Sequence, residues 1–268
     1  MTKKRILYVS QEITPYLPEN DLSKTSRFLP QAMNESGMDV RLFMPRFGCI
    51  NERRHQLHEV IRLSGMNLIV NDIDQPLIIK VASIPQARMQ VYFIDNEEYF
   101  KRKYTTEDKK GEFYEDNDER ALFFCRGVIE SVKKLGWSPD VIHCNGWMAS
   151  FLPMYLKKFY HDDPIFEKTK IVVSLYNQSF EGTLSDGLTD KLKFDGHSEE
   201  DVVGFEKADF KKLTETAINY SDAVIKGSTE LDADLLKMIE EAKLPTLEYS
   251  DGEYKEQYKP FYETLFEE

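Results

Sequence analysis

Residues 139–147 read Pro139-Asp140-Val141-Ile142-His143-Cys144-Asn145-Gly146-Trp147, a run typical of the end of a buried strand in an α/β protein. The apolar residues Val141 to Cys144 predict the strand, and the run from Met148 to Phe159 is compatible with a helix after the turn. In parallel α/β sheets, ligands bind at the carboxyl ends of the strands, where strand gives way to helix. We therefore expect His143 and Trp147 to lie near a site for a ring-shaped, hydroxyl-rich or phosphorylated ligand.

Strands and helices alternate on both sides of this run. Toward the amino terminus, Ile6 to Ser10 and Asp39 to Met44 predict two strands, and a helix between them is capped by Ser23 or Asp21 and runs to about Ser36. This order is the βαβ unit of a parallel sheet. Residues 178–206 show no clear period and predict a surface loop. The remaining elements predicted after residue 160 are strand 171–175, helix 210–220, strand 223–226, helix 233–242, strand 246–249 and an acidic amphipathic helix 253–268.

Two more segments lie between the first βαβ unit and the quoted run. Residues 57–95 hold short alternating runs separated by polar turns, which predict a β-ribbon, either an antiparallel insertion or an edge. The residues Asp116 to Glu119 have the form of a capping box, and the spacing after them predicts a largely buried helix up to Gly136. We expect a single domain over residues 1–268, with a doubly wound, mostly parallel, Rossmann-like α/β sheet and the ribbon at about 57–95.

Composition limits the classes of partner. The 268 residues carry a formal net charge of −12, so a nucleic-acid backbone is not an expected partner. No stretch approaches the roughly 18 apolar residues of a membrane helix, so no membrane partner is expected. Cys125 and Cys144 lie in apolar runs, which suggests reduced thiols in a cytoplasmic protein. No histidine pair has metal-ligand spacing with a carboxylate partner, and no metal site is predicted.

The loop after the first predicted strand, Gln11 to Asp21, contains no glycine. A dinucleotide-binding Rossmann domain needs glycine there, because the backbone must approach the pyrophosphate at a helix N-terminus. The chain also lacks a Walker-type lysine loop. We therefore expect neither NAD nor ATP bound in these modes, and no cofactor.

Three segments, in order along the chain, resemble motifs of the bacterial glycogen and starch synthases, which are GT-B glycosyltransferases. Residues 139–147 resemble P-D-[VI]-[VI]-H-x-H-D-W, although Asn145 and Gly146 replace the second His and the Asp. Residues 172–182 resemble [VF]-x-T-[VI]-H-N-x-x-Y-Q-G, with Tyr176 at the position of the family's His. Residues 220–228 resemble Y-A-D-x-[VI]-x-x-V-S, which is mostly a strand and supports the fold.

The first loop resembles a fourth motif, S-E-x-x-P followed by K-x-G-G-L-[AG]-D. In the family, this lysine and the glycine pair hold the phosphates of the donor sugar nucleotide. The matching positions are Ser10, Glu12 and Pro15. The departures are Pro18 for the lysine, Asn20 and Asp21 for the glycines, and Lys24 for the aspartate. Proline carries no charge, and side chains at the glycine positions block close approach of the backbone. This loop is therefore not expected to hold a nucleotide sugar.

The resemblance covers about residues 4–228 and implies the amino-terminal domain of a two-domain GT-B synthase. The implied reaction transfers glucose from a nucleotide sugar to an α-1,4-glucan, so an α-glucan or a nucleotide sugar is the implied ligand. The chain ends where the second domain would begin, so we expect it to be inactive alone and completed by a homodimer or a separate partner chain. The alternative is a non-catalytic glucan-sensing or protein-interaction module, because several groups of one site are lost together. A small-molecule epimerase or another GT-B-like enzyme is a third class, with no motif in its favour.

The resemblance and the strand ends together nominate substrate-binding candidates, and no catalytic residue is assigned. Four of the five candidates also have a purely structural interpretation. His143 could be a buried strand-end histidine, Trp147 a helix-packing anchor, Glu12 a turn or cap residue, and Asn177 a turn former. The candidates are Glu12, His143, Trp147, Tyr176 and Asn177.

Overall fold

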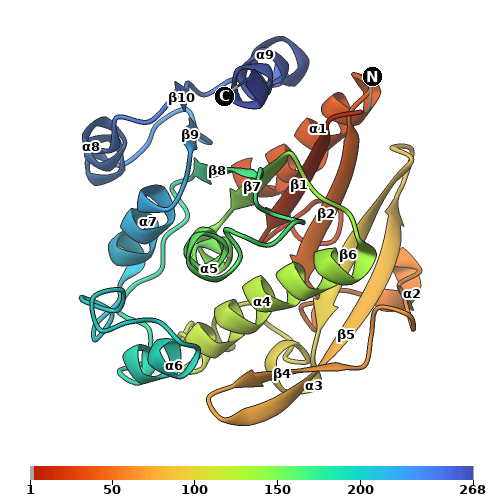
Figure 1. The fold of residues 1–268 in the computed structure, drawn as a ribbon. Helices are drawn as coiled ribbons and strands as arrows, with labels where there is room; N and C mark the ends of the chain where they lie inside the picture. The colour runs from red at the N-terminus through yellow and green to blue at the C-terminus, as the bar shows by residue number, and fades with distance from the viewer. Residues whose placement is uncertain (1–2, 268) are drawn as a thin grey trace.

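A computed structural model describes residues 3–267 and contains one large sheet with helices on both faces (Figure 1). Its strands are β1 (Arg5–Ser10), β2 (Asp39–Pro45), β3 (His58–Glu59), β4 (Met66–Val70), β5 (Ile73–Ile84), β6 (Met89–Asp95), β7 (Val141–Asn145), β8 (Lys170–Leu175), β9 (Ala223–Lys226) and β10 (Thr246–Leu247). Their order across the sheet is β10-β9-β8-β7-β1-β2-β6-β5-β3, and β4 pairs with β5.

All pairings from β10 across to β6 are parallel. The central strands β1, β7 and β8 are buried almost throughout, which explains why they read as nearly continuous apolar runs in the sequence. The predicted doubly wound, mostly parallel sheet is therefore confirmed. The helices that cover it are α1 (Asp21–Glu35), α2 (Glu52–His55), α3 (Glu97–Phe100), α4 (Asn117–Leu135), η1 (Trp147–Ala149), α5 (Leu152–Phe159), α6 (Leu188–Phe194), α7 (Phe210–Asn219), α8 (Ala233–Ala242) and α9 (Tyr254–Glu267).

The predicted ribbon extends the main sheet at one edge. Strands β5 and β6 pair antiparallel, whereas β6 pairs parallel with β2. The ribbon is therefore an edge of the sheet, one of the two arrangements left open by the sequence. In Figure 1 it lies on the right, away from α7 and α8. No helix in the described part of the chain is both long and apolar enough to cross a membrane.

The helices lie in two layers. Helices α1 and α9 pack together on one face of the sheet, and α4 and α5 lie on the other with η1 (Figure 1). Asn20 is the N-cap of α1, and its side chain and that of Ser23 form a capping box. The helix therefore begins at Asp21, and Gly37 at its end has φ of +94°, as expected for a residue after a helix.

Four local expectations are wrong. Neither Asp21 nor Ser23 is the N-cap of α1, because the side chain of Asn20 accepts from the amide of Ser23 and so caps the helix. The helix expected from Met148 is divided into η1 and α5, because Pro153 lacks an N–H and favours the first turn of a new helix. The segment 178–206 is more than a surface loop, since it contains α6 with two fully buried leucines. Asp116 precedes α4 without capping it through its side chain, because its carboxylate pairs with the guanidinium of Arg102.

Candidate functional site

The loop after β1 follows the carboxyl edge of the sheet. The amide of Gln11 donates to the carbonyl of Asn145 at 2.9 Å, and its side-chain oxygen accepts from the amide of Met148 at 3.2 Å. Gly146 lies between them with φ of +88°, and a Cβ there would lie 2.7 Å from Cβ of Gln11. The close approach of these two loops therefore requires glycine at position 146.

The part of this loop that replaces the glycine pair is held by its own side chains. The amide of Ser23 donates to Oδ1 of Asn20 at 2.8 Å, and the amide of Asn20 donates to Oγ of Ser23 at 2.9 Å. Nδ2 of Asn20 donates to Oε2 of the half-buried Glu12 at 2.6 Å. Glu12 therefore lies at the expected edge, but its carboxylate stabilises the loop and adds negative charge there.

Tyr176 and Asn177 follow β8 and point to different partners. Tyr176 is buried, and its hydroxyl donates to Oδ1 of Asn145 at 2.9 Å. Burial raises the pKa of this hydroxyl well above its usual value, so it stays protonated. Asn177 is exposed; its Nδ2 donates to the carbonyl of Glu230, and its Oδ1 accepts from the amide of Asp232. Both side chains therefore connect loops at the carboxyl edge.

Trp147 belongs to a cluster of aromatic side chains over the ends of β7 and β8. Its ring centroid lies 5.7 Å from that of Phe113 and 5.0 Å from that of Phe180. Phe113 and Phe180 stack at 4.7 Å, and Phe210 meets Phe180 edge-on. Trp147 is only 5% exposed, so it packs as an anchor while one side of it borders a cavity.

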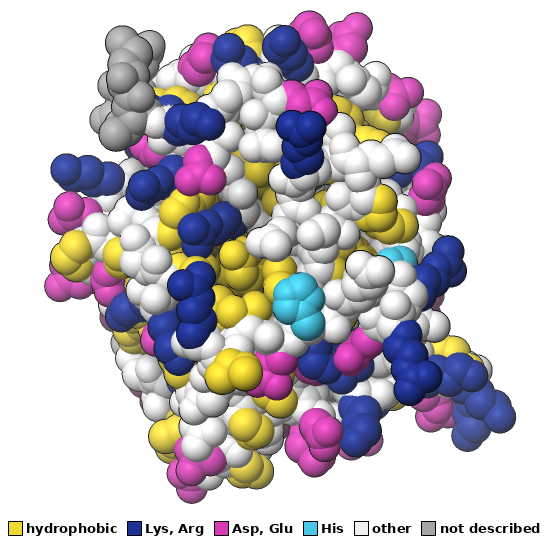
Figure 2. All heavy atoms as spheres, turned by 90° about the vertical axis from the view of Figure 1, so that its right-hand side faces the viewer, with side chains coloured by type: hydrophobic (Ala, Val, Ile, Leu, Met, Phe, Trp, Pro, Cys, Tyr) yellow, Lys and Arg dark blue, Asp and Glu magenta, His cyan; other side chains and the backbone are white. Residues whose placement is uncertain are grey.

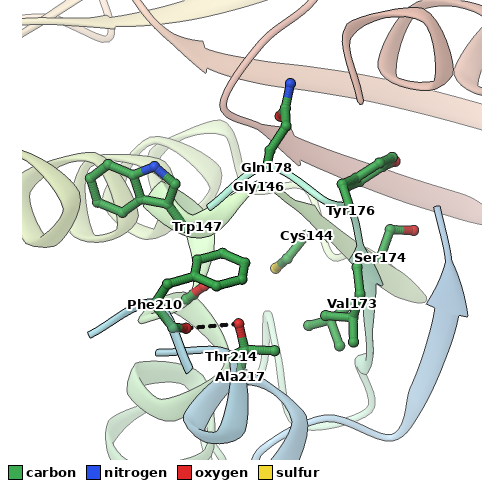
Figure 3. A pocket seen from close by; sticks show the side chains of 12 residues that line it. Cys144, Gly146, Trp147, Val173, Ser174, Tyr176, Gln178, Phe210, Thr214 and Ala217 are labelled. Carbon is green, nitrogen blue, oxygen red and sulfur yellow. Dashed lines mark hydrogen bonds between the residues drawn. The ribbon is translucent and has the colours of Figure 1, made fainter. Parts of the chain in front are cut away.

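That cavity lies between the ends of β7 and β8 and helix α7 (Figure 3). Trp147 and Phe210 stand on one side of it and Cys144 and Val173 on another, while Ser174 points toward the opposite face of the sheet. Its volume is about 30 Å³, compared with roughly 300–1,000 Å³ for typical ligand pockets. It has room for water but not for a sugar ring.

His143 lies away from this cavity. It is the third residue of β7, is fully buried, and lies beside Tyr8 of β1 under helix α9. Oη of Tyr262 lies 2.7 Å from its Nδ1, and Oγ of Ser174 lies 2.6 Å from its Nε2. Burial lowers the pKa of the imidazole to about 3, so the ring is neutral near pH 7. Both ring nitrogens of His143 therefore have internal partners, and a ligand-binding role for this residue stays a prediction.

Sequence reasoning missed a charged network at the same edge. Arg46 follows β2, and Asp95 is the last residue of β6. Nε of Arg46 lies 3.0 Å from Oδ1 of Asp95. Nζ of Lys80 contacts Asp95 at 2.9 Å and Glu52 at 2.7 Å. The available signal was the position of Arg46 and Asp95 directly after two predicted strands. Among the described residues, no group of His, Cys, Asp and Glu side chains is placed to hold a metal ion.

Comparison with known proteins identifies the family. Residues 5–244 match the family model described as "Starch synthase catalytic domain". The chain belongs to the starch synthase catalytic domain family.

Relatives within this family include bacterial glycogen synthases. The glycogen synthase of Chlorobium luteolum is 38% identical over 194 residues, which are 70% of this chain and 39% of that protein. The glycogen synthase of Chlorobaculum parvum is 35% identical over 227 residues, covering 84% of this chain and 46% of the relative. The chain thus spans less than half the length of these family members.

A solved structure of the same family shares the fold. It is the catalytic domain of starch synthase IV from Arabidopsis thaliana bound to ADP and acarbose, with a TM-score of 0.67 and 16% identity. The match covers 84% of this chain and 45% of that one. The resemblance found in the motifs and the expected mostly parallel α/β fold are both confirmed.

Proposed function

We propose that this chain is the amino-terminal, acceptor-side half of a glycogen/starch synthase-like glucosyltransferase and does not transfer glucose alone. Membership of the starch synthase catalytic domain family supports the first part. The second part depends on one observation. Side chains of the loop after β1 bind one another at the place where a donor phosphate would need free backbone amides and a positive charge. The side chain of Asn20 occupies this place, because it accepts from the amide of Ser23 and donates to the carboxylate of Glu12.

The chemistry of the loop opposes a diphosphate. Pro18 offers no charge, and Asp21 and the carboxylate of Glu12 repel an anion. The first amides of α1 would otherwise attract phosphate, but Asn20 already accepts from the amide of Ser23. Donor binding would therefore require groups supplied from outside this half.

The proposed substrates are a nucleotide sugar and an α-1,4-glucan. The solved starch synthase IV domain is bound to ADP, which is the nucleotide part of ADP-glucose, and to acarbose, an oligosaccharide analogue. A second half, whether a continuation of this chain, a second copy or a separate protein, would supply the donor groups. Transfer would then depend on positioning and on stabilisation of developing charge. The buried thiols of Cys125 and Cys144 suit the proposed cytoplasmic location.

An incorporation assay tests this function. ADP-glucose that carries labelled glucose is incubated with glycogen and the protein. One reaction contains no other protein, and the other also contains an extract of the source cells from which the cells' own glycogen synthase has been removed. We expect no incorporation by the protein alone and incorporation when the second half is present. Failure in both conditions would rule out the transferase half, and incorporation by the protein alone would contradict the closed loop.

The second candidate is a non-catalytic glucan-sensing or protein-interaction module. It is favoured by the loop after β1, where Pro18, Asn20 and Asp21 stand at the positions of the family's donor-binding lysine and glycine pair. Calorimetric titration with maltooligosaccharides should then show saturable binding. Micromolar binding of ADP-glucose would exclude this candidate.

Light scattering tests the proposed homodimer, which a purely monomeric profile would contradict.

A further inference from the structure

Arginine side chains gather around Trp137 at the amino-terminal ends of β1 and β2. The guanidinium carbon of Arg41 lies 4.7 Å from the Trp137 ring, and that of Arg5 lies 5.9 Å from it. The indole is buried, and its N–H donates to Oδ2 of Asp39 at 2.9 Å. Stacking therefore orients the guanidinium of Arg41 on a fixed surface. Arg5, Arg41 and the nearby Arg62 are called the arginine cluster below.

The arginine cluster has more positive than negative charge. Asp39 supplies the carboxylate near Arg41. The same carboxylate accepts from the indole N–H of Trp137 and lies 3.9 Å from Nε of Arg5. Nη1 of Arg41 is buried and has no hydrogen-bond partner in the described part of the chain. Burial lowers the pKa of Arg41; Tyr92 and Asp39 raise it, and the like charges of Arg5 and Arg62 lower it further. A buried donor without a partner, beside two like charges, favours an anion.

A groove of about 400 Å³ adjoins the cluster. It is lined by Arg62 of the cluster and by Tyr92. Val60 and Val81 line it with apolar surface, and Glu59 adds one carboxylate. This volume is in the range of small-molecule sites. Lys and Arg side chains also form a column along one side of the face in Figure 2, next to apolar side chains.

We propose that the arginine cluster binds the phosphate group of a small phosphomonoester, whose apolar organic part lies in the groove. Arg41 and Arg62 present planar donor forks that match a phosphate, and Tyr92 contributes both to the groove and to the field around Arg41. Glu59 disfavours a second anionic group on the ligand. Arg5 and Arg41 lie near the amino-terminal ends of β1 and β2, so this site is separate from the loop after β1 and independent of the proposed transferase function.

Titration calorimetry at constant ionic strength tests the proposal with phenyl phosphate, inorganic phosphate and malonate. We expect phenyl phosphate to bind at least tenfold more tightly than inorganic phosphate, because its ring enters the groove, and malonate to bind more weakly than either. Arg62→Gln should weaken phenyl phosphate binding at least tenfold. Arg62 is exposed, so this variant should keep its fold, which circular dichroism verifies; Arg41→Gln should have the same effect where it folds.

Arg53→Gln is the matched control, since Arg53 is an exposed arginine of α2 outside the cluster. It should bind phenyl phosphate like the unmodified protein. Three results would each overturn the proposal: no saturable binding of phenyl phosphate at 10 mM, equal affinities for phenyl phosphate and malonate, or equal losses in Arg62→Gln and Arg53→Gln. The last two would indicate nonspecific attraction of anions.

Discussion

At the scale of single residues, burial has turned candidate ligand groups toward internal partners. His143 and Tyr176 keep the polar atoms that suit a sugar site, but each meets a side chain of the same protein. Asn177 joins two loops through its amide. Because these groups are already hydrogen-bonded, a ligand would have to replace existing bonds rather than add new ones.

Tyr262→Phe should destabilise the fold by about 1–3 kcal/mol, because it leaves Nδ1 of His143 buried without its partner. Urea unfolding measures this change. Tyr258→Phe is the control, since Tyr258 is buried on the same face of α9 but lies away from the His143 nitrogen bonds. The control should lose less stability than Tyr262→Phe, because the hydroxyl of Tyr258 is not the partner of a buried ring nitrogen. Equal losses in the two variants would show that the hydrogen bond contributes nothing specific.

Stability should also decrease in mild acid. Burial lowers the pKa of His143 to about 3 and that of His197 to about 4, whereas an unfolded histidine has a pKa of about 6.5. The unfolded chain therefore binds protons that the folded chain does not, and the free energy of unfolding falls as the pH drops below 6.5. Each histidine contributes about 1.4 kcal/mol per pH unit well below that value.

The variant His143→Gln isolates one of these contributions. Its free energy of unfolding should fall less steeply between pH 6 and 4.5, by about 1.4 kcal/mol per unit, than that of the unmodified protein. Urea unfolding at several pH values gives both slopes. Parallel slopes would mean that His143 is not the group that resists protonation.

At the scale of elements, the carboxyl ends of β7, β8 and β9 are joined by contacts that depend on small residues. Gly227 follows β9, and a Cβ there would lie 2.4 Å from Cε1 of Tyr176. The ring cannot move freely, because its hydroxyl is bound to Asn145. Gly227 is therefore needed for the closure of this edge, which keeps the neighbouring cavity small.

Gly227→Ala should lower the free energy of unfolding by about 1–3 kcal/mol, since the added methyl overlaps the Tyr176 ring. Thermal unfolding followed by circular dichroism measures the loss. Gly187→Ala serves as the control: its φ is −79°, and the nearest atom to an added Cβ is 3.7 Å away. A loss in the control as large as that in Gly227→Ala would remove the steric explanation.

At the scale of the whole molecule, α9 lies outside the match to the family model but is part of the core. The match ends at residue 244, and α9 packs on α1 and over the sheet. Tyr258, Tyr262 and Leu265 are each no more than 2% exposed. The helix therefore covers the face of the sheet that carries His143 and Ser174.

Replacing these three buried residues of α9 by alanine should cost about 5 kcal/mol or more and broaden the unfolding transition. Near-ultraviolet circular dichroism during heating reports the loss of packing. The matched control replaces the exposed Glu256, Gln257 and Glu263 by alanine on the same helix. Similar transitions in both triple variants would contradict a core role for α9.

The strands, most helices and the family could be predicted from the sequence, because buried strands, helix periods and motif spacing are local properties of the chain. The direction in which the site residues face follows from tertiary packing. His143 and Tyr262 are 119 residues apart, so no local pattern connects them. Burial, loop closure at Gly227 and the docking of α9 depend on long-range packing, and these contacts determine which polar groups remain free to meet a ligand.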